Sequence, residues 1–274
     1  MGDIALSQCE RIEALAIGNC TYGGGANVKG SWVQITAATS FAYDSVTLIL
    51  LQPVTDGGGD SFLVDIGIGA AASEIVVVPN IHFDGSRGSF ADWTATITLL
   101  PITVASGSRL ACRCQAFGAA GSRTIDVFVV GRSGGSNLNR AITGPVVAYG
   151  VLTASTNATL VDQGAVANTY GAWTQIVLST SSAHNFLQVL VTNNDQNIGT
   201  AINNVFDFQV GLGGVGVETI IGQFRFGVSN GVGIVSIPAP LFAQIPSGTR
   251  IIARCKCDSV TASARNATFM ILAG

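Results

Sequence analysis

The chain contains the same segments twice, and this internal duplication limits the possible folds more than any other feature. GSWVQI at Gly30–Ile35 returns as GAWTQI at Gly171–Ile176, an offset of 141 residues. SGSRLACRC at Ser106–Cys114 returns as SGTRIIARC at Ser247–Cys255, at the same offset of 141. DIGIGAAASEI returns more loosely as FQVGLGGVGVETI. Repeats in one order along a chain indicate a structural module that is built twice.

Within each copy the apolar residues alternate with a period of two, which is typical of β-strands rather than helices. The expected strands of the first copy are RIEALAIG, SWVQITAAT, DSVTLILLQ, SFLVDIGIG, SEIVVVP, WTATITLLPITV, SRLACRCQAF and RTIDVFVV. Short strands separated by Gly, Asp, Asn or Pro favour a sandwich of the jelly-roll type. We therefore predict an all-β chain with two tandem antiparallel β-sandwich (jelly-roll-like) domains and an N-terminal arm.

The domain boundaries follow from the repeat and from one Gly- and Asn-rich stretch, GRSGGSNLNRAITGP, which is typical of a linker. The prediction places an N-terminal arm at 1–29, which can include the first strand of domain 1. Domain 1 then spans 30–131, the linker 132–145 and domain 2 146–274.

The composition excludes several classes of protein. Charged residues make up only 11% of the chain and the net charge is −3, so no basic footprint for nucleic acid is present. No apolar run is long enough for a membrane helix, and the N-terminus lacks the pattern of a secretory signal. Such a thin coat of charge suggests that neighbouring subunits cover much of the surface, and we expect a homo-oligomer such as a trimer or ring.

The series SWVQITAATSFAYDSVTLILLQ, FLVDIGIGAAASEIVVVPN, SGSRLACRCQA and IDVFVVG resembles a recurrent β-sandwich module in virion structural proteins of tailed bacteriophages. The resemblance implies a non-enzymatic protein of the virion exterior, assembled in the host cytoplasm, as capsid decoration, in the neck or collar, or associated with the tail. It also implies other virion proteins as partners and no membrane partner. The alternative is a fibre or receptor-binding module that recognises host glycan through loops at Asp56–Asp60, Asp84–Ser89 and Asn193–Asn204.

Four of the six cysteines lie in the two copies of one strand. Side chains two apart on a strand share a face, so Cys112 and Cys114 point with the apolar residues of their strand, as do Cys255 and Cys257. This pattern predicts small core residues rather than a metal site, which would need four ligands in a chain with only two histidines.

The other two cysteines, Cys9 and Cys20, lie in the N-terminal arm, where we expect them outside any apolar strand face. Two interpretations stay open: both are free thiols, or one or both form a disulfide with a core-strand cysteine or with another subunit. All six cysteines are candidates for such a bond, which would reinforce the particle.

Four arginines, Arg109, Arg113, Arg250 and Arg254, are predicted on the outward face of the repeated strand. They serve either an interface between subunits or local ion pairs with carboxylates such as Glu74 and Glu218. Trp32 and Trp173 are expected to fill the sandwich cores, with a sugar-stacking platform as the alternative.

The sequence offers no catalytic constellation, and we expect no enzymatic activity, cofactor or bound metal. His82 and His184 do not correspond in the two copies, because Tyr43 stands at the counterpart of His184. Asp65 and Glu74 could form a glycosidase pair. However, Glu74 recurs at Glu218 whereas Asp65 falls opposite Phe208, which argues against a dyad.

Overall fold

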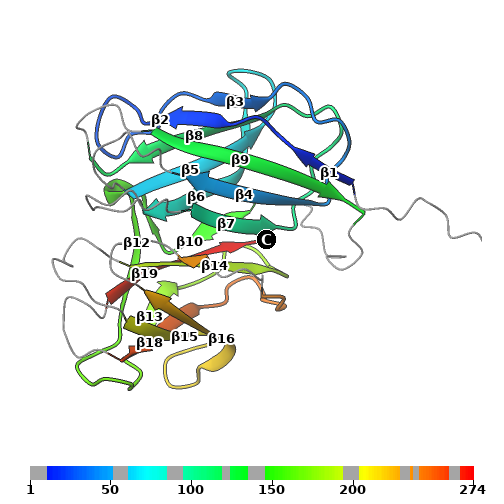
Figure 1. Cartoon of the computed structure of the whole chain (residues 1–274). Coiled ribbons are helices and arrows are strands. Elements are labelled where there is room, and N and C mark those ends of the chain that lie inside the picture. The colour runs from blue at the N-terminus through cyan, green and yellow to red at the C-terminus, as the bar shows by residue number, and fades with distance from the viewer. Residues whose placement is uncertain are drawn as a thin grey trace, which may run out of the picture.

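The computed structural model describes residues 11–51, 61–84, 95–118, 124–134, 146–193, 204–228, 235–236, 241–258 and 266–274. Within these residues the chain folds almost entirely into antiparallel strands, and the prediction of two tandem β-sandwiches is confirmed (Figure 1). The described helical structure is a single 3-10 turn, η3 (Thr153–Ser155). No helix in the described part is long and apolar enough to cross a membrane.

Sandwich 1 consists of two sheets. Sheet 1 has the order β1-β9-β4-β7, with β2 also on β9, and is built from β1 (Arg11–Ala14), β2 (Gly18–Thr21), β4 (Ser45–Leu51), β7 (Ala95–Leu100) and β9 (Thr124–Ser133). Sheet 2 has the order β3-β8-β5-β6 and is built from β3 (Val33–Thr36), β5 (Ser61–Ile68), β6 (Ile75–Asp84) and β8 (Leu110–Ala116).

Sandwich 2 repeats this arrangement. Sheet 3, ordered β11-β12-β19-β14-β17 with β10 also on β19, contains β10 (Val147–Tyr149), β11 (Val151–Leu152), β12 (Asn157–Asp162), β14 (Leu187–Asn193), β17 (Val235–Ser236) and β19 (Asn266–Ala273). Sheet 4, ordered β13-β18-β15-β16, contains β13 (Thr174–Val177), β15 (Asn204–Leu212), β16 (Thr219–Val228) and β18 (Ile251–Cys257).

Strand pairing gives the residue equivalences between the two copies. Cys20 pairs with Ile125 as Val161 pairs with Ala267, so β2 corresponds to β12 and β9 to β19. The N-terminal segment is therefore part of the fold from Arg11 onward, because β1 and β2 both pair with β9.

Alternation along the strands decides which side chains form the cores. In β9 every second residue from Ile125 to Val129 is buried, while the residues between them are only partly covered. The inner faces of sheets 1 and 2 make one apolar cluster, and those of sheets 3 and 4 make a second. A shift by one residue would turn these side chains outward, so burial fixes the register.

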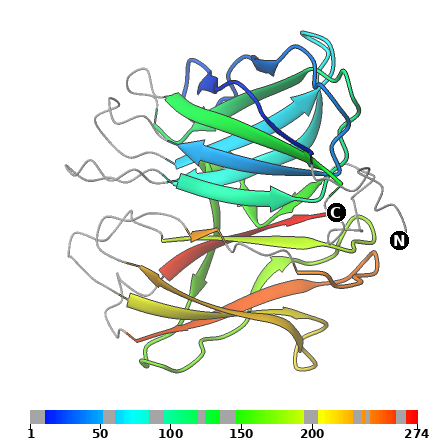
Figure 2. The ribbon, with the colours of Figure 1, turned by 45° about the vertical axis from the view of Figure 1, so that its right-hand side comes forward.

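The central strands of sheet 3, β14 and β19, are buried on both of their faces. Val189, Phe269 and Ile271 point into the core of sandwich 2, whereas Met270 and Leu272 belong to the apolar cluster of sandwich 1. Strands β6 and β7 at the edge of sandwich 1 lie against the outer face of sheet 3 (Figures 1 and 2). Burial of each large apolar side chain contributes about 1.5–3 kcal/mol. The apolar side chains at this joint therefore hold the two sandwiches together in the way that a hydrophobic core holds two sheets together.

Candidate functional site

The repeated arginines on the outer sheet faces hold local structure in place. Arg109 Nη1 donates to Glu74 Oε1 at 2.7 Å and to the Gly69 carbonyl at 3.2 Å, and its Nε donates to Gln34 Oε1 at 3.0 Å. The Glu74 carboxylate is only 1% exposed. Burial of Glu74 opposes ionisation, but its hydrogen bonds to Arg109 and to backbone amides outweigh this and lower its pKa. Arg109 thus ties the β5–β6 hairpin to β3.

Sandwich 2 contains the equivalent Arg–Glu pair at a longer distance, and we call each pair, Arg109 with Glu74 and Arg250 with Glu218, a clasp. Arg250 Nη1 donates to the Gly213 carbonyl at 3.1 Å and lies 3.9 Å from Glu218 Oε1, while its Nε donates to Gln175 at 3.4 Å. The equivalence of these contacts shows that the duplicated Arg and Glu residues brace the same hairpin in both copies.

Trp32 is not a core residue, so that prediction is wrong. It precedes β3 and lies over Gly67 on the outer face of sheet 2, where a Cβ on Gly67 would come within 2.7 Å of the ring. The Arg113 guanidinium lies over the ring, with Cζ 4.5 Å from its centroid. Trp173 has the same position in sandwich 2, between Gly211 and Arg254, whose Cζ is 4.3 Å from a ring centroid. Both rings are partly exposed and already packed.

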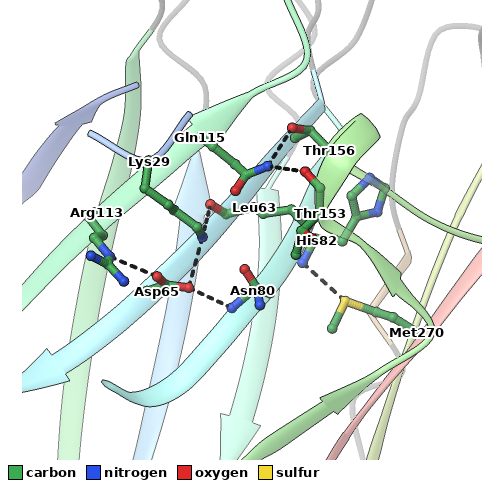
Figure 3. A network of polar contacts seen from close by, with 10 residues as sticks. All are labelled: Lys29, Leu63, Asp65, Asn80, His82, Arg113, Gln115, Thr153, Thr156 and Met270. Carbon is green, nitrogen blue, oxygen red and sulfur yellow. Dashed lines mark hydrogen bonds and ion pairs between the residues drawn. The ribbon is translucent and has the colours of Figure 1, made fainter. Parts of the chain in front are cut away.

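A buried carboxylate organises the outer face of sheet 2 (Figure 3). Asp65 accepts hydrogen bonds from Lys29 Nζ at 2.8 Å, from Arg113 Nε at 2.9 Å and from the Asn80 amide at 2.8 Å. Asp65 therefore braces the outer face of sheet 2, because it links two cationic side chains to a backbone amide.

The counterpart of Asp65 is Gln209, which corrects the expected match with Phe208. Asp65 pairs with Arg113 across the sheet as Gln209 pairs with Arg254. Arg254 Nε donates to Gln209 Oε1 at 2.8 Å, so an amide replaces the carboxylate in the second copy.

One row of residues across the equivalent sheets differs in charge between the copies. In sheet 2 the row is Gln115, Leu63 and His82, and in sheet 4 it is Lys256, Asp207 and Arg225. Asp207 pairs with Lys256 at 3.2 Å and accepts a bond from Arg225 Nη2 at 2.9 Å. Hydrogen bonds from Arg225 and then from Lys256 outweigh desolvation and lower the pKa of Asp207.

The neutral row lies at the joint between the sandwiches. Gln115 Nε2 donates to the Thr153 carbonyl at 2.7 Å and to Thr156 Oγ1 at 2.8 Å (Figure 3). Thr156 Oγ1 in turn donates to Asn27 Oδ1 at 2.6 Å. His82 is buried, its backbone amide lies 3.2 Å from Met270 Sδ, and neither ring nitrogen has a hydrogen-bond partner among the described residues. Burial lowers the pKa of His82 to about 4.

Three thiols lie inside sandwich 1. Cys20 is fully buried on the inner face of β2, and Cys112 and Cys114 are fully buried on β8. Cys20 Sγ lies 4.0 Å and Cys112 Sγ 3.8 Å from the same Gly18 carbonyl oxygen. The expectation that Cys20 lies outside an apolar strand face is therefore wrong. The thiols of Cys112 and Cys114 and desolvation raise the pKa of Cys20 far above its ordinary value. Cys9 lies outside the described residues.

Sandwich 2 lacks the third thiol, because Val161 stands at the position of Cys20. Cys255 Sγ lies 3.5 Å from the Val161 carbonyl, and burial raises the pKa of Cys255. The described cysteines, Cys20, Cys112, Cys114, Cys255 and Cys257, are all buried, and none of them forms a disulfide in this structure.

The two histidines lie in different surroundings and do not form a site together. His184 Nε2 contacts the Tyr149 hydroxyl at 2.8 Å, and in sandwich 1 the equivalent Tyr43 donates to Glu13. Across the described ranges, no group of three or more His, Cys, Asp or Glu side chains could hold a metal ion. The proposed glycan loops lie almost wholly outside the described residues.

No protein-family model matches this chain, and no curated protein matches it significantly. Among solved structures it is similar to PNGF-II, with a TM-score of 0.47, 9% identity and coverage of 94% of this chain and 65% of that one. It is also similar to the CBM22-1–CBM22-2 tandem domain of Paenibacillus barcinonensis Xyn10C (TM-score 0.27, 10% identity, 96% and 91% covered). A structure of infectious bursal disease virus, Gx strain, gives a TM-score of 0.23 at 12% identity, with 97% and 71% covered.

The chain spans slightly less than two thirds of the length of the PNGF-II structure. All three TM-scores lie below 0.5, so these similarities do not bear on the function.

Proposed function

We propose that the chain is a non-enzymatic structural component of the exterior of a tailed-bacteriophage virion, as capsid decoration, in the neck or collar, or on the tail. The observation that carries the proposal is the joint, where Leu190, Met270 and Leu272 are buried against sandwich 1. Close packing at this joint makes the two modules one rigid unit, which suits a mechanical role.

The residues that recur in both copies also support a structural role. Arg109 with Glu74 and Arg250 with Glu218 brace their own hairpins, and Trp32 and Trp173 pack against arginine and glycine. Fold alone does not determine function, but these recurring side chains stabilise the scaffold itself in both copies.

The surface favours contacts with other proteins. The tips of the equivalent hairpins carry exposed apolar side chains, with Ile75 71% exposed in sandwich 1 and Val215 86% exposed in sandwich 2. Exposed apolar groups on a chain with only 11% charged residues suit burial in an assembly. The partners we propose are further copies of the chain, as a ring or trimer, and other virion proteins.

The glycan-binding alternative has less support from the described residues. Sugars stack on free aromatic faces, whereas Arg113 and Arg254 lie over the rings of Trp32 and Trp173.

Labelling of intact particles tests the proposal. Particles purified from cells that carry the gene are exposed to a gold-tagged antibody against the chain, and label at regular positions on the outer surface is expected. Particles that lack the chain should regain the label when the purified protein is added back. A chain that stays in the soluble fraction and binds to no particle would contradict the proposed role.

A further inference from the structure

The joint between the two sandwiches uses different surfaces of two equivalent modules. Sandwich 1 contributes the strand edge formed by β6 and β7, and sandwich 2 contributes the outer face of sheet 3. Three apolar side chains on that face, Leu190, Met270 and Leu272, are at most 1% exposed. Sandwich 1 uses its strand edge in this joint and sandwich 2 uses a sheet face. The equivalent sheet face of sandwich 1 and the equivalent strand edge of sandwich 2 therefore take no part in the joint.

The face recurs on sandwich 1, where its described side chains are more exposed than those of sheet 3. Ile49 pairs with Phe128 on β4 and β9 as Leu190 pairs with Met270 on β14 and β19. By the same register Val130 is the counterpart of Leu272. The outer face of sheet 1 therefore carries equivalent apolar residues, which are partly exposed.

This face continues onto the edge strand β7. Ile97 pairs with Ile49 and is 54% exposed, and Leu99 on the same strand is partly exposed. Leu51 on β4 also points outward and is partly covered. An apolar row across three strands is the type of surface that is covered in sheet 3.

The strand edge recurs on sandwich 2, where its described side chains are more exposed than those of β6. Sheet 4 ends at β16 as sheet 2 ends at β6, and Ile81 and His82 on β6 correspond to Phe224 and Arg225 on β16. Both β6 residues are buried, whereas Phe224 is partly exposed and Arg225 is exposed. Ile220, nearer the hairpin, is 46% exposed.

An insertion explains why the row that ends at Arg225 is charged. In sandwich 2, Val147 on β10 and Val161 on β12 both pair with β19 and are 14 residues apart. Their equivalents in sandwich 1, Glu13 on β1 and Cys20 on β2, pair with β9 and are only 7 residues apart. The extra residues contain η3, which covers the neutral row through Gln115. Sandwich 1 has no such turn, so an edge docked on sheet 1 would leave Lys256 in water. Arg225 would lie beside Phe128, as His82 lies beside Met270, and a guanidinium is stable on an aromatic ring.

We infer that the outer face of sheet 1 receives the β16 edge of sandwich 2 from a second copy of the chain. The contact repeats between copies the arrangement that joins the sandwiches within one copy, and it gives a surface to the self-assembly part of the proposed function, on which it rests. Such head-to-tail contacts are heterologous, so they produce a closed ring or a filament.

The first experiment measures the mass of the full chain in solution. At about 100 µM, which would saturate a micromolar contact, light scattering should give at least twice the 28.0 kDa of one chain. Phe128→Asp and Ile97→Asp on the face, and Ile220→Asp on the edge, should each reduce the mass to that of smaller species. Leu178→Asp is the matched control, because Leu178 is 67% exposed and follows β13, at the opposite edge of sheet 4 from β16, and it should leave the mass unchanged. Far-UV circular dichroism checks that every variant is folded.

Mixing two variants tests the head-to-tail geometry. A face variant still has a working edge, and an edge variant still has a working face, so an equimolar mixture of Phe128→Asp and Ile220→Asp should form dimers and nothing larger. If the edge variant assembles alone and the mixture forms no new species, the faces pair with each other and the inference is wrong. A monomeric wild type at this concentration also overturns it.

The results distinguish failure of the self-docking contact from failure of the proposed virion role. A wild-type chain that is monomeric yet returns to particles lacking it would refute the self-docking face and leave the proposed function intact. A chain that forms the expected oligomer but binds to no particle would do the reverse.

Discussion

Cys20 on β2 and Cys112 on β8, from the two opposing sheets of sandwich 1, both direct their thiols at the Gly18 carbonyl oxygen, at 4.0 Å and 3.8 Å. A cross-link here would join sheet 1 to sheet 2. Both thiols are fully buried, so they are protected from reagents as long as the sandwich stays folded.

Oxidative refolding is expected to form a disulfide in sandwich 1 only. When the unfolded chain refolds with oxidised glutathione, two thiols pass two electrons and two protons to the glutathione disulfide. This gives two molecules of reduced glutathione and links Cys20 to Cys112 or Cys114. Closing a loop of this length stabilises by roughly 4 kcal/mol. Peptide mapping after alkylation identifies the bond.

The second sandwich supplies the control, because Cys20→Val copies the Val161 of sandwich 2. This variant should fold, lose the cross-link and show the urea midpoint of the reduced wild type. A disulfide between Cys255 and Cys257, or a cross-link that persists in the variant, would show that the arrangement of the thiols in sandwich 1 does not direct pairing.

Removing the clasp of sandwich 1 should destabilise the chain more than removing that of sandwich 2. Arg109→Ala leaves the buried Glu74 carboxylate without its cation, and a decrease in Tm of roughly 4 °C is expected. Arg250→Ala should have a smaller effect, because Arg250 and Glu218 are 3.9 Å apart and Glu218 is more exposed. Calorimetry of the two variants checks the order, and equal decreases would contradict it.

Much of the architecture was predictable because burial imposes a simple pattern on strands. The period of two and the repeat predicted the sandwiches, and the parity of Cys112 and Cys114 with Leu110 placed them in the core, where they lie. Cys20 was misplaced because GNCT is too short and too polar to show an alternating face, and only its pairing with β9 turns it inward.

The position of Trp32 and Trp173 on the outer sheet faces was harder to predict, because only two glycines in the sequence indicate it. Gly67 and Gly211 stand in strand interiors, where a glycine often marks close approach of another group, and both accommodate a tryptophan ring. The joint between the sandwiches was equally hard to predict from the sequence. The run FMILA in β19 is apolar at successive positions, which is typical of a strand that is buried on both faces, but no local rule names the partner.

Acid should weaken the joint through His82. Its pKa falls from 6.5 to about 4 on folding, so between these values the unfolded chain binds a proton that the folded chain does not. Stability is therefore complete above pH 6.5 and is lost as the pH decreases toward 4, by roughly 3 kcal/mol in total.

The control for this pH effect is His82→Leu, which cannot titrate. Urea midpoints measured at pH 7 and pH 5 should differ less in this variant than in the wild type. Part of the difference should remain, because burial also lowers the pKa of His184. Identical pH profiles for the two proteins would show that His82 is accessible to protons in the folded state.

The space beneath the two tryptophans predicts unequal tolerance of alanine. A Cβ on Gly67 would lie 2.7 Å from Trp32 and 3.2 Å from the Glu74 Cβ, whereas one on Gly211 would lie 3.1 Å from Trp173. Gly67→Ala must displace a rigid ring and should cost about 1–3 kcal/mol in urea unfolding, while Gly211→Ala should cost less. Adding Trp32→Leu to Gly67→Ala removes the obstructing ring, so the double variant should lose less than the two single losses combined. Strict additivity would show that the ring does not rest on Gly67.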